Sequence, residues 1–277
     1  MSLDWYSNKV VLITGASKGI GREVARQAAA AGAKVIVIAR SEVSLAELAS
    51  EINQSSGQAL AVTADVGNKK QLMYAIDEAV KRFGRIDVAI ANAGIEYLGP
   101  VEFLKDSELQ AMVDTHLFGL FHLTQAVLPI MHRQEVGTIV HVSAPIAQLG
   151  FIWSSGYTAT KAAADGFISV VRRELANTGI RAITVYPGPT LTEAGAHLPL
   201  EQLPSWHLES SNKLLPKDTA RQLLEAIAKG KPTPVLAGSI RLLMAMQRWV
   251  PALAEWLINR IEGGSNKIAK KIASSAS

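Results

Sequence analysis

The 277-residue chain contains no cysteine. Disulfide bonds, thiol nucleophiles and thiolate metal sites are therefore excluded, whereas reducing and oxidising compartments stay undistinguished. The six histidines never occur in the His-x-x-x-His or His-Glu-x-x-His spacing that places two metal ligands on one helix face. We consequently expect no metal site and no metal-dependent hydrolysis.

We also expect neither a signal peptide nor a membrane-spanning helix from the sequence. The polar start, Met1 to Lys9, leads directly into a short apolar run and lacks the features of a signal peptide. The apolar segment Ser239 to Glu262 is interrupted by charges too often to span a bilayer. We expect a cytoplasmic protein, with contact to a membrane surface through residues 239–271 left open.

The excess positive charge is confined to the C-terminal end. The formal net charge is +4, yet basic and acidic side chains are equal in number over residues 1–237. The whole excess comes from Arg241, Arg248, Arg260, Lys267, Lys270 and Lys271, which outnumber Glu255 and Glu262. Nucleic-acid-binding domains usually spread basic residues over a folded face, with aromatic residues between them. The neutral body therefore argues against a nucleic-acid partner.

Short runs rich in Val and Ile alternate with longer amphipathic or Ala-rich segments. This pattern predicts βαβ units with right-handed crossovers around a buried parallel sheet, which is a doubly wound α/β fold. Strands are expected at 10–14, 34–38, 59–64, 87–92, 138–143, 181–186 and 234–236, and helices begin near Gly19, Ser44, Lys69 and Ser107.

We expect one domain over residues 1–237, followed by a basic tail, 238–277. Within the domain, 187–216 is rich in proline and has no clear strand, which is typical of a long loop that covers a substrate site. In the tail, apolar residues recur at helical spacing and predict an amphipathic helix. They are Leu242, Met246, Trp249, Leu253, Trp256 and Leu257.

A glycine-rich segment, Thr14-Gly15-Ala16-Ser17-Lys18-Gly19-Ile20-Gly21, joins the first expected strand to the first expected helix. Glycines allow a ligand to approach the backbone, and the amides at a helix start attract phosphate. The segment predicts a pyrophosphate site, although a tight turn without a ligand would use similar residues. Four further motifs follow it: Asp65-Val66, Asn92-Ala93-Gly94, Tyr157-Thr-Ala-Thr-Lys161 and Pro187-Gly188-Pro189-Thr190-Leu191-Thr192.

In this order and rough spacing, the five motifs resemble those of the short-chain dehydrogenase/reductase family over residues 8 to 240. The resemblance implies a Rossmann fold, hydride transfer between an alcohol and a carbonyl with NAD(P), and a homodimer or homotetramer. The oligomer would form through the long helices that carry Phe118 and Tyr157. The implied cofactor-binding residues are Gly15, Ser17, Lys18, Gly19, Ile20, Gly21, Arg40, Asp65, Val66, Asn92, Ala93, Gly94, Tyr157, Lys161, Pro187, Gly188, Thr190 and Thr192.

Two of these assignments can be argued from chemistry. An acid after the second strand accepts the ribose hydroxyls of NAD, whereas a cation there suits the 2′-phosphate of NADP. This chain has Arg40 after that strand and Lys18 in the glycine loop, so we predict NADP(H) unless both are ordinary solvated cations. Asp65, which the resemblance places against adenine, could instead cap the following helix.

The resemblance also implies the catalytic residues. Tyr157 and Lys161 lie one helical turn apart, and at about 4 Å an ammonium would lower the pKa of a phenol by up to roughly three units. The family usually has a serine thirteen residues before the tyrosine, but that position is Ala144, so either Ser143 serves or the hydroxyl is absent. His116 stands where relatives have an asparagine and would hold a water, relay a proton or be merely structural.

Apolar residues in two loops predict either a lipophilic substrate or a partner subunit that covers them. Leu198, Leu200, Leu203, Trp206, Leu208, Leu214 and Leu215, together with Phe151, Ile152 and Trp153, would line a pocket for a lipophilic ketone, aldehyde or alcohol. A partner subunit covering these loops is the alternative. For the tail, packing on the same subunit, exchange in a dimer and contact with a membrane surface all stay open. The unusual Ser143 and His116 positions also leave open an NADP(H)-binding sensor without turnover.

Overall fold

The computed structural model describes residues 3–192 and 213–262. Six strands form one parallel sheet in the order β3-β2-β1-β4-β5-β6. They are β1 (Val10–Thr14), β2 (Lys34–Ala39), β3 (Gln58–Thr63), β4 (Val88–Ala91), β5 (Gly137–Val142) and β6 (Ile180–Val185). The order reverses between β1 and β4, which confirms the doubly wound fold. Ligands of such sheets bind beyond the carboxyl ends of the strands at this reversal.

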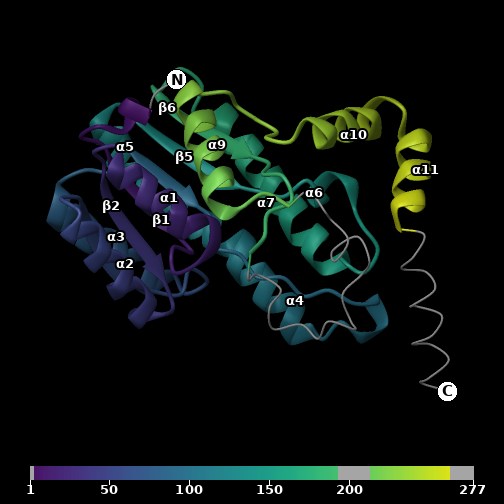
Figure 1. Cartoon of the computed structure of the whole chain (residues 1–277), viewed down its shortest axis with the longest axis horizontal. Helices are drawn as coiled ribbons and strands as arrows, with labels where there is room; N and C mark the ends of the chain where they lie inside the picture. Colours follow the sequence, from purple (N-terminus) through teal and green to yellow (C-terminus); the bar gives the residue numbers. More distant parts are fainter. Residues whose placement is uncertain (1–2, 193–212, 263–277) are drawn as a thin grey trace.

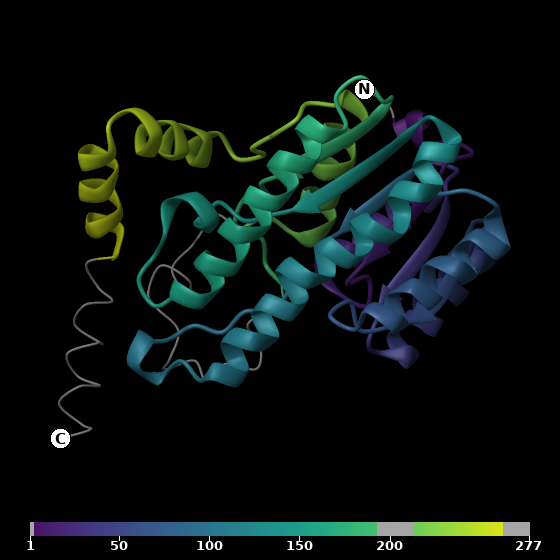
Figure 2. The ribbon, with the colours of Figure 1, turned by 180° about the vertical axis from the view of Figure 1, so that it is seen from behind.

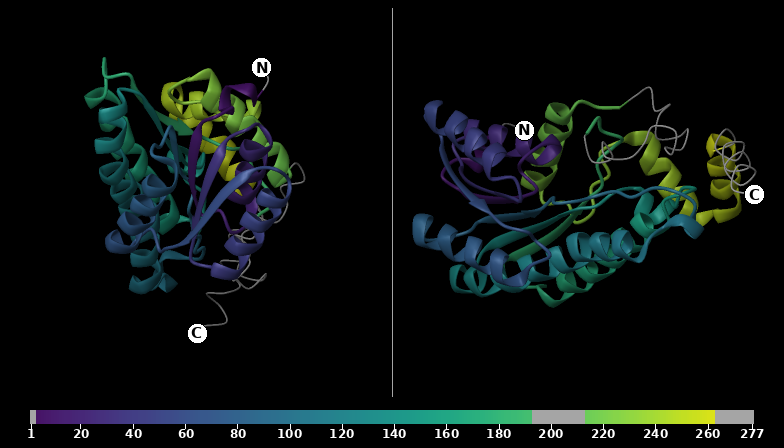
Figure 3. Two further views of the ribbon diagram at one scale, coloured as in Figure 1. Left: turned by 90° about the vertical axis from the view of Figure 1, so that its left-hand side faces the viewer. Right: turned by 90° about the horizontal axis from the view of Figure 1, so that it is seen from below.

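Helices cover both faces of the sheet (Figures 1 and 2). One layer consists of α1 (Gly19–Ala30), α2 (Glu42–Gln54) and α9 (Pro216–Lys229), and the other of α3 (Lys69–Phe83), α5 (Gly119–Gln134) and α7 (Ser155–Glu174). Figure 3 shows the sheet between these layers. The shorter elements are η1 (Leu3–Tyr6), η2 (Val101–Phe103), α4 (Asp106–Val113), the π-helical turn η3 (Asp114–Phe118) and α6 (Ile146–Leu149).

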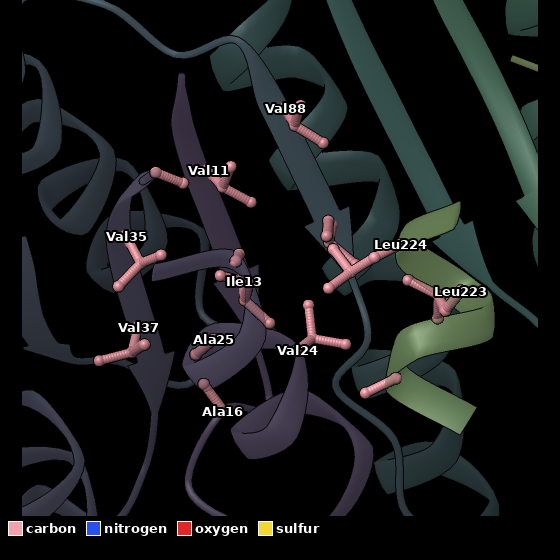
Figure 4. Close-up of a cluster of buried hydrophobic side chains, with 14 of the residues drawn as sticks. Val11, Ile13, Ala16, Val24, Ala25, Val35, Val37, Val88, Leu223 and Leu224 are labelled. Atoms are coloured by element: carbon pink, nitrogen blue, oxygen red, sulfur yellow. The ribbon is translucent and has the colours of Figure 1, made fainter. Parts of the chain in front are cut away.

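Alternate side chains of each strand enter different cores. On β1, Val11 and Ile13 pack with Val24 of α1 in the core under α9 (Figure 4), whereas Val10 and Leu12 face the α3, α5 and α7 layer. Because both faces are covered, the strands are continuous apolar runs that are easy to find in the sequence. The six strands start and end within one residue of their expected bounds.

The seventh strand expected at 234–236 is wrong. This segment runs beside β6 but forms only a single bridge there, between Val235 and Tyr186. The Tyr186 N–H donates to the Pro234 carbonyl and the Leu236 N–H donates to the Tyr186 carbonyl, both at 2.9 Å. Pro232 and Pro234 have no N–H to donate, so a regular ladder cannot form.

The apolar stripe of the tail folds as two helices, α10 (Gly238–Trp249) and α11 (Pro251–Glu262), and not as one. Pro251 cannot continue α10, but it suits the first position of α11. Val250 before it leaves the helical conformation, with φ −141° and ψ 64°. The pair lies at one end of the molecule, with α10 near α6 (Figure 1). Among the described helices, none has the length and apolar character needed to cross a bilayer.

Candidate active site

A cavity of about 1320 Å³ opens at the carboxyl ends of the strands. It is lined by the glycine loop, the ends of β2, β3, β4 and β5, the start of α7, and the segment after β6. All of the expected cofactor-binding residues line it except Gly21, and so does Ser143. Five motifs that are far apart in the sequence therefore meet around one space.

The glycine loop has the shape of a phosphate cradle. Gly15 and Gly19 have φ angles of 67° and 57°, in the left-handed region that favours glycine. A Cβ at Gly15 would lie 2.6 Å from the Cα of Ala93, so no larger residue fits. Helix α1 begins at Gly19, so its first amides have no partner within the helix. The first amides of α1 thus remain suited to phosphate, and the loop fits a dinucleotide.

Gly21 and Asn92 hold the loop from inside the protein. A Cβ at Gly21 would collide with the Gly15 carbonyl oxygen and lie 2.5 Å from the Asn92 amide nitrogen. Asn92 Nδ2 donates to the carbonyl oxygens of Thr14 (3.0 Å) and Gly15 (3.2 Å). The amides of Asn92 and Ala93 both donate to Thr14 Oγ1 at 3.1 Å. The Asn92 side chain therefore joins the loops after β1 and β4.

Asp65 lines the cavity directly after β3. Its Oδ1 accepts a hydrogen bond from the Gly67 N–H at 2.9 Å. The cap of α3 is Asn68, whose side chain accepts from the Gln71 N–H. The alternative interpretation of Asp65 as the helix cap is therefore wrong. This turn places Asp65 and Val66 at the cavity, and their contact with adenine stays a prediction.

Tyr157 and Lys161 lie one turn apart on α7 and both line the cavity. Lys161 Nζ donates to the Val142 carbonyl at 3.1 Å and lies 5.9 Å from the centre of the Tyr157 ring. Burial lowers the pKa of Lys161 to about 8, opposed by the charges of Asp165 and Glu96. The expected lowering of the Tyr157 pKa by Lys161 is not seen: burial, and then Glu96, raise this pKa above its ordinary value. The phenol is thus held in the protonated form that a proton donor needs.

Ser143 is the first residue after β5, and it is buried at the cavity wall with 3% exposure. Its N–H donates to the Val185 carbonyl at 2.9 Å, but its Oγ has no hydrogen-bond partner among the described residues. Ala144 lines the same wall without a hydroxyl. Buried hydroxyls are normally hydrogen-bonded, so the Ser143 Oγ fits a ligand oxygen.

His116 lies in the π-helical turn η3, is buried, and is not among the residues that line the cavity. Its Nε2 accepts from the Ile95 N–H at 3.2 Å, so this nitrogen carries no proton. The Nδ1–H then donates to Thr160 Oγ1 at 2.9 Å, and Thr160 donates to the Tyr157 carbonyl at 3.1 Å. Burial, followed by the charge of Lys161, lowers the pKa of His116 well below its ordinary value. The neutral ring thus joins the segment after β4 to α7, and a proton relay through Nε2 would break the Ile95 hydrogen bond.

Comparison with known proteins agrees with this geometry. The family model described as short chain dehydrogenase matches residues 9–202. A 3-oxoacyl-[acyl-carrier-protein] reductase of Synechocystis is 35% identical over 196 residues, covering 70% of this chain and 79% of the relative. The zebrafish dehydrogenase/reductase SDR family member 7B is 31% identical over 240 residues, covering 83% and 78%. The chain belongs to the short-chain dehydrogenase/reductase family.

Solved structures of the family share the fold. A short-chain dehydrogenase/reductase of Burkholderia phymatum in complex with NAD superposes with a TM-score of 0.82 at 23% identity, covering 90% of this chain and 95% of that one. An alcohol dehydrogenase of Thermococcus sibiricus complexed with 5-hydroxy-NADP has a TM-score of 0.73 at 27% identity, covering 83% and 95%. The chain is thus an oxidoreductase of carbonyl or alcohol groups.

Two charged residues of this short-chain dehydrogenase site were missed in the sequence. Arg22 lines the same cavity as Lys18 and Arg40. Its guanidinium donates to the carbonyls of Ser17 (3.3 Å) and Ser44 (3.1 Å) and lies 3.6 Å from Glu51 Oε2. The position of Arg22 directly after Gly21 could have indicated from the sequence that it belongs to the site. Glu96 lines the other end, where burial raises its pKa to about 7 against the opposing charges of lysines. Glu96 follows the Asn92-Ala93-Gly94 motif by two residues, and nothing in the sequence around it indicates that it lies in the site.

The apolar side of the cavity differs in part from the expectation. Phe151 lines it, but Ile152 and Trp153 do not, and Trp153 is buried elsewhere. Ile240 and Leu243 of α10 and Ile261 of α11 line it instead. Leu214 and Leu215 are not part of its wall, while the expected contributions of Leu198, Leu200, Leu203, Trp206 and Leu208 lie outside the described residues.

Proposed function

We propose that the protein is an NADPH-dependent reductase of lipophilic ketones or aldehydes. The observation that carries this proposal is one cavity. It has a phenol, an ammonium and a buried hydroxyl without a hydrogen-bond partner in the described part of the chain at one end, and three cations at the other. Lys18, Arg22 and Arg40 suit a ribose 2′-phosphate, and the residue after β2 is Arg40 where an NAD-binding site would have an acid.

The side chains have separate roles in the proposed reduction. Bound NADPH supplies a hydride. Ser143 Oγ donates a hydrogen bond to the carbonyl oxygen of the substrate, and Tyr157 Oη–H gives its proton to the oxygen as negative charge develops there. Lys161 stabilises the phenolate that remains, and His116 keeps the Ile95 backbone in place. The raised pKa of Tyr157 favours this direction because the phenol starts in its protonated form.

The substrate class is argued from the wall that α10 and α11 contribute. Ile240, Leu243 and Ile261 face the cavity together with Ile146 and Phe151, and an apolar wall binds an apolar chain or ring. Catalytic efficiency should therefore rise with chain length in a series of alkyl ketones. Equal efficiency along the series would remove the basis for a lipophilic substrate.

Turnover is tested by following NADPH oxidation with a panel of ketones and aldehydes. Tyr157→Phe should lower kcat by about 10²-fold or more and leave NADPH binding within a few-fold of wild type. Arg40→Ala should raise the KM for NADPH about tenfold, the change expected for losing about 1.4 kcal/mol of phosphate contact, with little change for NADH. Tight NADPH binding without turnover on any compound would favour the sensor, and equal use of NADH would refute the cofactor assignment.

We also propose that the tail touches an anionic membrane surface. Leu242, Trp249 and Trp256 are exposed by 64, 77 and 54%, and Arg248 and Arg260 lie over the two tryptophan rings. Tryptophan and flanking cations are typical of interfacial helices. Co-sedimentation with vesicles containing phosphatidylserine should fall for Trp249→Ser with Trp256→Ser, and no binding by wild type would refute this contact.

The remaining predictions concern domain limits and assembly. Helix α10 begins at Gly238, but residues of α10 and α11 complete the cavity wall, so we propose a tail that works as part of the catalytic unit. The homodimer or homotetramer through α5 and α7 stays a prediction. Phe118 at the start of this α5 surface is 41% exposed, and sedimentation of Phe118→Asp against wild type tests the contact.

A further inference from the structure

A polar network lies behind the catalytic pair, on the side of α7 that faces the sheet. Its centre is Asp165, one helical turn after Lys161. Tyr186 Oη donates to Asp165 Oδ2 at 2.8 Å and accepts from Gln148 Nε2 at 2.7 Å. Tyr186 directly precedes Pro187, and Gln148 lies on α6, which follows Ser143. One carboxylate therefore connects α7 to both segments that complete the site.

The second oxygen of Asp165 meets His141 of β5. His141 Nε2 lies 3.2 Å from Asp165 Oδ1, and both atoms are buried. Burial lowers the pKa of His141 in spite of this carboxylate, so the ring is neutral at pH 7. Arg172, further along α7, directs its guanidinium to the Ala182 carbonyl and Thr184 Oγ1. The charge of Asp165 acts on both Arg172 and Lys161. Of these two cations, Lys161 lies one helical turn before Asp165 on α7 and lines the cavity.

We propose that Asp165 is a positioning residue of the active site, which keeps Lys161 in the ammonium form and aligns α7 with the segments that carry Ser143 and Pro187. The consequence for turnover rests on the proposed reductase function, whereas the coupling of the two charges does not. The titratable groups that face this pair are Tyr157 and Arg172 on α7, His141 on β5, Tyr186 after β6, Glu96 after β4 and His116 in η3.

The first test measures the coupling in the apo protein. Asp165→Asn removes the charge but leaves an oxygen that accepts from Tyr186. One charge on the neighbouring helical turn should change the pKa of Lys161 by about one unit at an effective dielectric constant of about 20. Asp165→Asn should therefore reduce the folding equilibrium constant about tenfold more at about pH 6, where Lys161 is charged, than at about pH 9.5, where it is neutral.

Two controls separate this coupling from general destabilisation. In a Lys161→Met background, the effect of Asp165→Asn should no longer differ between the two pH values. Asp77→Asn, on the exposed side of α3, should show no pH-dependent effect in either background. An equal effect of Asp165→Asn at both pH values, or a difference that persists with Lys161→Met, would overturn the proposal.

The second test uses the holoenzyme. For carbonyl reduction, Asp165→Asn should move the alkaline limb of the kcat profile to lower pH by about one unit, because Lys161 then loses its proton more easily. Tyr186→Phe should lower kcat without moving that limb. An unmoved limb in Asp165→Asn would contradict the proposal. If the wild type reduces no carbonyl, the proposed function fails, and the unfolding measurements still decide the role of Asp165.

Discussion

Replacing Glu96 by glutamine should stabilise the protein, and only at neutral to alkaline pH. Glu96 lines the cavity, where burial raises its pKa from 4.5 to about 7 although the charges of Lys213 and Lys161 oppose this change. A carboxyl whose pKa is raised by folding favours the native state while it is protonated. That contribution is complete below about pH 4.5 and is lost as the pH rises through about 7.

The magnitude follows from the size of the pKa change. A rise from 4.5 to about 7 corresponds to at most about 3 kcal/mol between the two protonation states. Glutamine has a similar shape and never ionises, so Glu96→Gln should unfold with about 1–3 kcal/mol more free energy than wild type at about pH 8. At about pH 4.5 the difference should be close to zero, because wild-type Glu96 is then protonated in the native state.

Urea denaturation followed by tryptophan fluorescence at both pH values measures this difference. Glu102→Gln is the matched control, because Glu102 is exposed on η2 and its replacement should change little at either pH. A Glu96→Gln variant that is less stable than wild type at about pH 8 would refute the reasoning. It would mean that the ion pairing of Glu96 with the lysines outweighs the cost of its burial.

Three further outcomes are expected. Gly21→Ala should lower the free energy of unfolding by about 1–3 kcal/mol, because its Cβ collides with the Gly15 carbonyl. It should also weaken NADPH binding more than tenfold in a fluorescence titration. Unchanged stability and affinity would contradict the cradle geometry. His116→Asn, which keeps an acceptor for the Ile95 N–H, should retain more kcat than His116→Ala in the same NADPH assay, and equal losses would argue against that hydrogen bond. The Ile152 N–H donates to Glu262 Oε1 at 2.6 Å, so Glu262→Ala should lower Tm by removing this acceptor. A Tm equal to wild type would show that α11 is held by other contacts.

Prediction from sequence worked best where local chemistry decides structure. The glycine loop needs φ angles near 60°, and only Gly15 and Gly19 adopt them easily, so the motif and its shape are nearly equivalent. Tyr157 and Lys161 share a face because they are one helical turn apart. The stripe at 239–262 misled us because helical periodicity outweighed Pro251, which ends one helix and starts another.

The features that could not be predicted from the sequence depend on contacts between distant segments. Asp65 had two interpretations in the sequence, and the position of Asn68 as the cap of α3 excluded one of them. The pKa of Glu96 depends on which groups surround it in the folded protein, and the residues next to it in the sequence do not show this. The lowering of the Tyr157 pKa was argued from one neighbour alone, whereas burial in the folded protein acts in the opposite direction.

The sequence by itself determined the doubly wound sheet, the family and most of the motif residues that line the cavity. Strand burial, turn chemistry and helical spacing depend on residues that are close together in the sequence. Only the tertiary structure showed Ser143 with a hydroxyl that has no partner within residues 3–192 and 213–262, His116 as a neutral link to Ile95, and Asp165 joined to Tyr186. These features arise where β4, β5, β6 and α7 meet. Their charges and hydrogen bonds depend on burial and on partners that only the folded chain brings together.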